Sequence, residues 1–147
     1  MKYYTEEECL EALQRATKVI NEITESCENY TRGINDCFAL LVEYDYQLKG
    51  KTRARDYVKF RWKTTREFIV KLAQEGYSLA DYMEYCGYEI LNNKRPQIGD
   101  IAFENGAMIN NGDFWVSTNE NNTGVANTRQ AHFLERHLHV LARPIRS

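Results

Sequence analysis

Cys37 is the residue of this sequence that is best placed to do chemistry. It follows Asn35 and Asp36, two residue types that often cap the start of a helix, and apolar residues recur after it at helical spacing. We therefore expect Cys37 in the first turn of a helix whose other side is buried. Backbone N–H groups in that turn lack helical partners and favour a thiolate over a thiol. Buried cysteines in core helices are nevertheless common and inert, and on this stretch alone the inert interpretation is favoured.

The basic stretch, which we define as residues 49–66, is the second place where residue types could act together. Eight cations there have only Asp56 as a counter-charge, and three aromatic residues lie among them. The mixture suits a partner interface, or phosphates and bases, but a solvated segment whose aromatics fold back onto the core is the plainer interpretation. If the stretch binds, a protein is favoured over nucleic acid because the formal net charge of the chain is −2. The residues expected to bind that protein are Arg53, Arg55, Tyr57, Arg61 and Trp62.

Length and composition predict a globular chain with one core. The 147 residues suffice for a single domain, and 43% of them are hydrophobic, 12% aromatic and 27% charged. No stretch approaches the length of a membrane span, and residues 1–8 lack the apolar core of a signal peptide. We therefore expect neither a membrane partner nor secretion by a signal peptide.

The cysteines give no sign of a metal site or of a disulfide scaffold. They are scattered along the chain without a Cys-x-x-Cys motif, at Cys9, Cys27, Cys37 and Cys86. We expect no metal and no other cofactor, and synthesis in a reducing compartment. Cys9, Cys27 and Cys86 are expected to pack in the core.

Four helices are expected to position these residues. The first covers residues 5–26 and starts with a capping box, and the second covers residues 36–48. A third begins at residues 64–67 and ends at Gly76, and a fourth begins at Ser78 and ends at Gly87. The buried face of the first helix is expected to hold Leu10, Leu13, Thr17, Ile20, Ile23 and Cys27, and that of the third Phe68, Ile69, Leu72 and Ala73.

Beyond Pro96 the hydrophobic period changes from helical to alternating. Short strands are expected at residues 98–103, 107–109 and 114–118, with hairpin turns between them, followed by a last strand at 138–145. Residues 130–136 read as a helical turn or an irregular loop.

This order predicts an α+β fold in which N-terminal helices pack on a small antiparallel sheet. Residues 1–147 form one domain, divided into an N-terminal helix and connector at 1–32, a helical half with Cys37 at 33–95, and a sheet half at 96–147.

Three motifs, in this order, resemble the NlpC/P60-like (papain-like) cysteine peptidase superfamily. They are Asn35-Asp36-Cys37 at a helix start, Gly99-Asp100-Ile101-Ala102-Phe103 at the first sheet strand, and Gly124-Val125 after the third. The resemblance covers about residues 30–144 and is closest to a branch found in phages and prophages, often among tail genes. It implies that Cys37 is the nucleophile and that the Gly-Asp strand packs against its helix.

The sequence departs from this family at the catalytic base. Family members place a histidine at the start of the second sheet strand, which falls here at Gly106-Ala107-Met108, and none of these side chains takes a proton. All three histidines lie far downstream. His139, in the expected last strand, could turn toward Cys37, since triads are defined by geometry and not by chain order. A strand histidine without a catalytic role is the favoured interpretation.

Two functions from different classes are therefore considered. The favoured one is a degenerate peptidase-like fold that serves as a structural or assembly component of a phage particle near its tail, with other virion proteins as partners in a multi-chain assembly. The alternative is an active cysteine hydrolase that cuts peptidoglycan peptides or a related amide with Cys37. Nucleic-acid binding through the basic stretch is a third and weaker idea. The expected location is the virion or the host cytoplasm.

Overall fold

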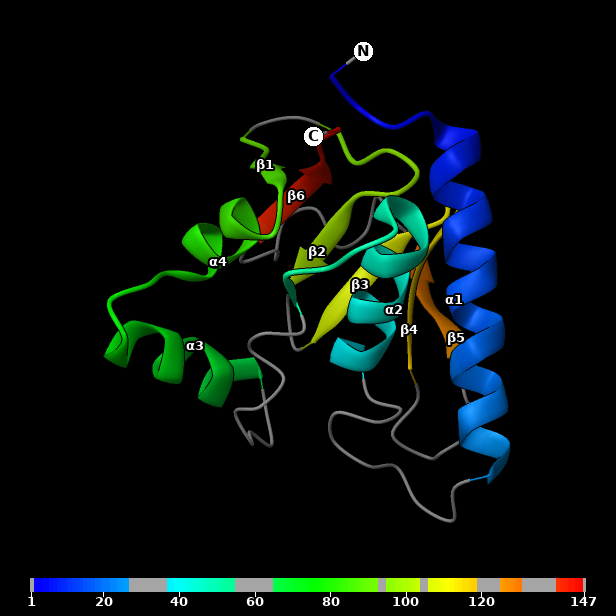
Figure 1. Ribbon diagram of the computed structural model, residues 1–147, viewed down its shortest axis with the longest axis horizontal. Helices are drawn as coiled ribbons and strands as arrows, with labels where there is room; N and C mark the ends of the chain where they lie inside the picture. Colours follow the sequence, from blue (N-terminus) through cyan, green and yellow to red (C-terminus); the bar gives the residue numbers. More distant parts are fainter. Residues whose placement is uncertain are drawn as a thin grey trace.

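The computed structural model describes residues 2–26, 37–54, 65–92, 95–103, 106–118, 125–130 and 140–146 (Figure 1). The helices in these ranges are α1 (Glu6–Ser26), α2 (Cys37–Lys49), α3 (Thr65–Gln74) and α4 (Leu79–Tyr85). The strands are β1 (Tyr88–Ile90), β2 (Ile101–Phe103), β3 (Ala107–Asn110), β4 (Phe114–Thr118), β5 (Val125–Gln130) and β6 (Val140–Pro144). All four helices precede the strands, which confirms the α+β prediction.

The strands of the described residues form one antiparallel sheet in the order β1-β6-β2-β3-β4-β5. Successive hairpins join β2, β3 and β4, whereas β6 returns from the far end of the chain and inserts between β1 and β2. In that position Ala142 has Ile90 as its partner on one side and Ile101 on the other. α1 and α2 lie together over β3, β4 and β5, and α4 lies beside β1 and β6 (Figure 1).

α2 is the central element of the core. Most of its residues are buried, including the run from Cys37 to Val42, because α1 packs on one side of it and the sheet on another. Phe38 extends this core toward the other helices: its ring meets Phe68 of α3 edge-on at 4.7 Å between centroids, and Phe68 in turn meets Tyr82 of α4 at 5.1 Å. A helix surrounded in this way needs apolar residues around most of its circumference rather than along one stripe.

α1 begins with the predicted capping box but buries a different face. Thr5 Oγ1 accepts the N–H of Glu8 at 3.1 Å, and the Glu8 carboxylate accepts the N–H of Thr5 at 3.0 Å. The predicted Leu10 and Thr17 are only half-buried. The small side chains of Ala12 and Ala16 let α2 approach α1 closely. Steric fit therefore determines which face of α1 is buried as much as hydrophobicity does. The fully buried residues are Cys9, Ala12, Leu13, Ala16, Ile20 and Thr24, while Cys27 lies outside the described residues.

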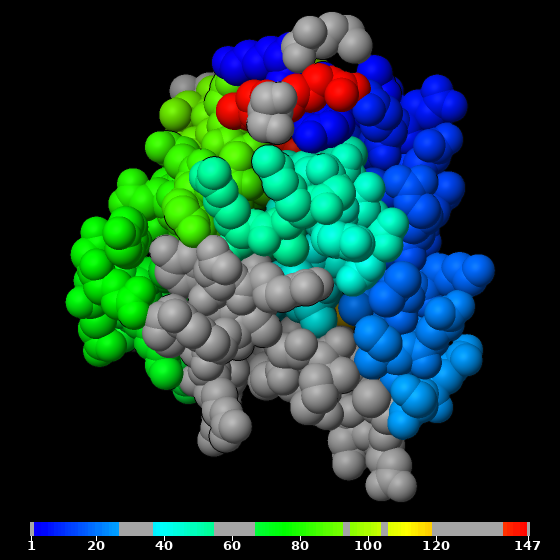
Figure 2. Space-filling model, viewed as in Figure 1, coloured from blue at the N-terminus to red at the C-terminus, as the bar shows by residue number. Residues whose placement is uncertain are grey.

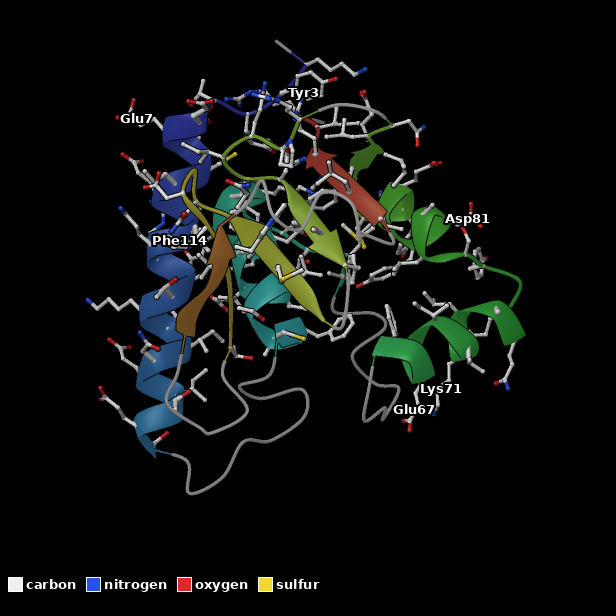
Figure 3. All side chains as sticks on the ribbon, turned by 180° about the vertical axis from the view of Figure 1, so that it is seen from behind. Tyr3, Glu7, Glu67, Lys71, Asp81 and Phe114 are labelled. Atoms are coloured by element: carbon white, nitrogen blue, oxygen red, sulfur yellow. The ribbon has the colours of Figure 1, made fainter. Side chains whose placement is uncertain are left out.

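α3 ends and α4 begins as predicted. Gly76 has a φ of +89°, and its N–H bonds to the carbonyl of Ala73 at 3.0 Å, which closes α3. Ser78 and Asp81 form a capping box at the start of α4, where Figure 3 labels Asp81. The prediction that Ala73 is inside is wrong. Ala73 is exposed, because the core side of this short helix is occupied by Phe68 and Leu72.

Two strands were not predicted from the sequence, and one predicted strand is shorter than expected. β1 directly follows Gly87, and β5 lies in a polar stretch; both exist because neighbouring edges, those of β6 and β4, accept their backbone hydrogen bonds. β2 starts at Ile101 and not at residue 98. The cause is Gly99, whose φ of +94° belongs to a turn closed by the Asp100 N–H on the Gln97 carbonyl at 3.0 Å.

The predicted alternation along β6 is confirmed where the strand is described. Val140 and Ala142 join the core beneath the helices. Leu141 packs on the opposite face of the sheet, against a small cluster made of Ala102, Met108 and Trp115. Gln130, the first residue of the predicted helical turn or irregular loop, is the last residue of β5, and residues 131–139 lie outside the described residues.

The two ends of the described chain are held together. Tyr3 forms a β-bridge with Ile145, and the N–H of Arg146 bonds to the carbonyl of Lys2 at 2.9 Å. The Arg146 guanidinium also pairs with Glu8 at the start of α1. Figure 2 shows the N-terminal segment and the end of β6 side by side, above the segment that follows α2. These contacts fix where Ile145 lies.

Candidate functional site

Cys37 is the first residue of α2 and is buried, with 8% of its surface exposed. The backbone N–H of Ala107, the first residue of β3, donates a hydrogen bond to Cys37 Sγ at 3.4 Å. The thiol therefore lies where a helix start and a strand start meet, as the sequence predicts for its helix. The capping residues Asn35 and Asp36 lie outside the described residues.

The helix of Cys37 also packs on the strand that the Gly-Asp motif opens. The rings of Phe38 and Phe103 are 5.9 Å apart between centroids, and Phe103 is the register partner of Ala107. Cys37 thus contacts β3, the strand that pairs with β2 in the sheet. This is the arrangement expected from the cap and from the apolar residues that follow it.

The Gly-Asp motif itself has a structural role. A Cβ on Gly99 would lie 2.5 Å from both Cβ and Sγ of Cys9, so only glycine fits there. Tyr44 of α2 donates to the Gly99 carbonyl at 2.9 Å, which ties the turn to the central helix. The Asp100 carboxylate is fully buried and binds the Arg143 guanidinium through both oxygens, at 2.9 and 3.0 Å. Burial raises the pKa of the Asp100 carboxyl, and the bonds from Arg143 oppose that shift.

Residues 106–108 are where the sequence resemblance places the expected base. Here the contact with Cys37 Sγ is made by a peptide N–H, and the Ala107 methyl group accepts no proton. Met108 points to the other face of the sheet, into the cluster with Trp115. The hydroxyl of Ser117 on β4 donates to the Ala107 carbonyl at 3.0 Å and so holds this peptide group in place. The Ala107 contact supplies a hydrogen-bond donor to sulfur, whereas deprotonating a thiol requires an acceptor.

Ser117 is a residue of this site that the sequence reasoning missed. It is buried to 7% exposure in a strand of large apolar residues, and a small polar residue in such a strand was the available signal. His132, His137 and His139 lie outside the described residues. Whether His139 reaches Cys37 therefore stays a prediction.

The basic stretch is only partly described, and one of its cations needs correction. Lys49 is not a free surface cation: its Nζ lies 2.7 Å from Asp45 Oδ1 and donates to the Cys86 carbonyl at 2.7 Å. An acidic residue one helical turn earlier is therefore a counter-charge that the count within 49–66 overlooked. Lys51 and Arg53 are exposed as expected. The other predicted partner-binding residues, Arg55, Tyr57, Arg61 and Trp62, lie outside the described residues.

The Asp45–Lys49 pair belongs to a buried polar cluster. Tyr88 donates its hydroxyl to Asp45 Oδ1 at 2.7 Å, and Lys49 Nζ lies 4.2 Å from the centroid of the Tyr88 ring. Burial raises the pKa of Tyr88 well above its ordinary value, and the charge of Asp45 adds to the shift. Tyr88 therefore remains a protonated donor. The sequence signal for this cluster is the Asp-x-x-x-Lys spacing at the end of an apolar helix.

Two further classes of site are not seen in the part of the chain that the structure describes. No three His, Cys, Asp or Glu side chains there lie close enough together to hold a metal ion. Among the described helices none is both long and apolar enough to cross a membrane.

Comparison with known proteins adds no relative. No protein-family model matches the chain, and no curated protein or solved structure is detectably similar to it. The resemblance to NlpC/P60-like peptidases therefore rests on the three sequence motifs alone.

Proposed function

We propose that this chain is a catalytically inactive NlpC/P60-like domain that serves as a structural or assembly component of a phage particle, near its tail. The motif resemblance supplies the family and the setting. The observation that carries the loss of activity is the contact at Cys37, where Ala107, within the stretch 106–108 expected to hold the base, offers a backbone N–H.

Catalysis by Cys37 would require proton transfer away from its sulfur. A cysteine nucleophile is activated by a base within hydrogen-bond reach of the sulfur, and that base, once protonated, gives its proton to the leaving amine. The Ala107 amide can do neither, because it holds its hydrogen at neutral pH and has no lone pair for another. This contact therefore stabilises the sulfur and cannot deprotonate it, as expected for a structural cysteine.

The packing around Cys37 supports the same proposal. Cys37 is buried in the cluster that also contains Phe38, Phe103 and Ala107, so the thiol contributes to the core on which the helix and sheet meet. A fold that keeps this core after losing its catalytic activity is useful for its surface. The exposed Lys51 and Arg53, at the described start of the basic stretch, are the part of that surface we assign to partner proteins.

The experiment compares wild type with Cys37→Ala on two substrates. Peptidoglycan fragments are incubated with each protein and analysed by mass spectrometry for cleaved amides, and a thiol-directed activity probe is followed by gel. We expect no turnover, and no labelling above that of Cys37→Ala.

One observation favours the alternative of an active cysteine hydrolase: Cys37 lies at a helix start and receives an N–H, and both features stabilise a thiolate. Turnover that disappears in Cys37→Ala and also in His139→Ala would establish this alternative and refute the proposal. Retained turnover in His139→Ala would identify a different base.

A further inference from the structure

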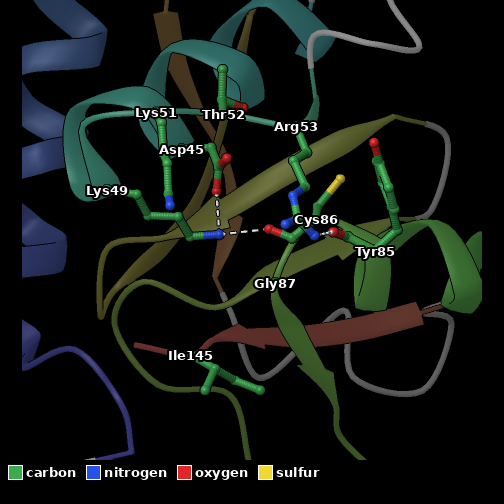
Figure 4. Close-up of a pocket in the computed structure, with 9 residues that line it drawn as sticks. All are labelled: Asp45, Lys49, Lys51, Thr52, Arg53, Tyr85, Cys86, Gly87 and Ile145. Carbon is green, nitrogen blue, oxygen red and sulfur yellow. Dashed lines mark hydrogen bonds and ion pairs between the residues drawn. The ribbon is translucent and has the colours of Figure 1, made fainter. Parts of the chain in front are cut away.

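A pocket opens beside the C-terminal end of α2. Cys37, at the other end of this helix, is not among its lining residues. The pocket lies between the segment that follows α2, the turn from α4 to β1, and the end of β6 (Figure 4). The lining includes Lys51 and Arg53 from the first segment, Tyr85 at the end of α4, Gly87 from the turn that follows, and Ile145 directly after β6. Residues far apart in the sequence are thus brought to one hollow.

Two of the cations in this pocket are available to a ligand. Lys51 and Arg53 are exposed, and in Figure 4 Lys51 lies next to Lys49, whereas Arg53 lies beyond Asp45, next to Tyr85. Tyr85 orients the Arg53 side chain through two contacts. The guanidinium carbon of Arg53 lies 5.5 Å from the centroid of the Tyr85 ring, and Nη1 donates to the Tyr85 carbonyl at 3.4 Å. A planar guanidinium held on one side presents its remaining N–H groups in a fixed direction, which suits the two oxygens of a carboxylate.

The third cation is already neutralised, and its partner shapes the floor of the pocket. Lys49 is paired with Asp45, so the pair adds no net charge. Asp45 Oδ1 accepts from both Lys49 and Tyr88, whereas Oδ2 is buried without a hydrogen-bond partner. Although the pair has no net charge, Asp45 Oδ2 leaves an electronegative atom without a donor beneath the pocket, whereas the exposed Lys51 and Arg53 make the rim positive. This arrangement disfavours phosphate, whose charge is spread around the whole group, and favours a group that is charged at one end only.

Size and apolar lining narrow the ligand further. The cavity volume is about 180 Å³, below the roughly 300–1,000 Å³ of sites for drug-sized molecules. The Ile145 side chain and the Tyr85 ring, which is 43% exposed, give the carbon atoms of a ligand something to contact. A single acidic side chain or a chain terminus fits this description, and a nucleic-acid backbone does not.

We propose that this pocket binds a carboxylate of a partner protein, with Lys51 and Arg53 holding the carboxylate at the rim and Tyr85 and Ile145 contacting the carbon atoms next to it. The assignment rests on the proposed function in taking the ligand to be part of a partner protein. The carboxylate comes either from an Asp or Glu side chain or from a C-terminus.

The test measures binding of short peptides by isothermal titration calorimetry at low salt. One probe is the acetylated and amidated peptide Gly-Leu-Glu-Leu-Gly, and its control carries Gln in place of Glu. A second probe is acetylated Gly-Leu-Gly with a free C-terminus, and inorganic phosphate is the third. We expect one of the two carboxylate peptides to bind at least about tenfold more tightly than the Gln control, because a hydrogen bond to a charged group is stronger than one to a neutral amide.

Matched variants locate the binding. Lys51→Gln/Arg53→Gln should weaken the binding of the carboxylate peptide at least about tenfold. Lys18→Gln/Arg95→Gln removes the same charge at two exposed positions outside the pocket lining and should leave binding within about twofold. Both double variants alter exposed side chains, and circular dichroism verifies their fold.

The outcomes distinguish failure of the carboxylate pocket from failure of the proposed loss of catalytic activity. Binding of neither carboxylate peptide, equal loss in both double variants, or tighter binding of phosphate would each overturn the carboxylate pocket. None of these results bears on Cys37, whose inactivity is decided by the peptidoglycan and probe assays.

Discussion

Replacing Lys49 by methionine should destabilise the protein far more than an ordinary surface lysine would. The side chain of Asp45 is 1% exposed and that of Lys49 is 11% exposed, so water replaces little of what is lost. Lys49→Met removes a 2.7 Å contact with Asp45 Oδ1 and a 2.7 Å bond to the Cys86 carbonyl. Asp45 then keeps only the hydroxyl of Tyr88. Removing one partner of a buried pair costs about 3–5 kcal/mol, chiefly because the remaining charge is left uncompensated.

The assay is urea unfolding followed by circular dichroism, with a double-mutant cycle. Asp45→Asn in the Lys49→Met background removes the stranded charge and should recover much of the lost free energy of unfolding, giving a coupling of about 1–3 kcal/mol. Lys51→Met is the matched control, since Lys51 is exposed, and should change stability by no more than about 0.5 kcal/mol. A cost below about 1 kcal/mol for Lys49→Met, the range of exposed ion pairs, would refute the reasoning.

Three further predictions follow from other parts of the molecule. Gly99→Ala should lower the free energy of unfolding by about 2–4 kcal/mol, because it adds a steric clash to the strain of a positive φ; Gly50→Ala, where a Cβ meets nothing within 4 Å, isolates the strain and should cost about 1–2 kcal/mol. Hydrogen bonds from backbone N–H groups at the two helix caps are the largest cause that lowers the pKa values of Glu8 and Asp81. The two carboxylates therefore contribute to folding stability above the unfolded pKa values of about 4, and this contribution is lost as the pH falls through the folded values. The difference in melting temperature between wild type and Glu8→Gln/Asp81→Asn should therefore shrink from pH 7 to about pH 2, and a constant difference would argue against these caps. Charge reversal in the basic stretch should block incorporation into the particle while the isolated domain stays folded by circular dichroism, and normal assembly together with salt-sensitive DNA binding by wild type would favour nucleic acid instead. The triple variant is Arg53→Glu, Arg55→Glu and Arg61→Glu.

Local signals in the sequence sufficed for much of the fold. Helix caps and stops act within one or two helical turns, so they can be recognised without knowing the fold. The examples here are the caps at Thr5 and Ser78 and the stop at Gly76. The turn at Asn111-Gly112 is also confirmed, with a φ of +105° at Gly112. β1 and β5 were missed because an edge strand owes its existence to the strand beside it. The side chains of such an edge strand need not follow a pattern that predicts a strand.

The candidate site divides in the same way. Residue types and local spacing were enough to predict that Cys37 starts a buried helix and that no side chain of residues 106–108 takes a proton. Three contacts could be found only in the folded molecule: the Ala107 N–H meets the sulfur, Asp45 pairs with Lys49 beside the ring of Tyr88, and Lys51 and Arg53 share a pocket with Ile145. The physical reason is distance along the chain: a contact across 70 residues depends on sheet register and helix packing, which the whole core fixes together.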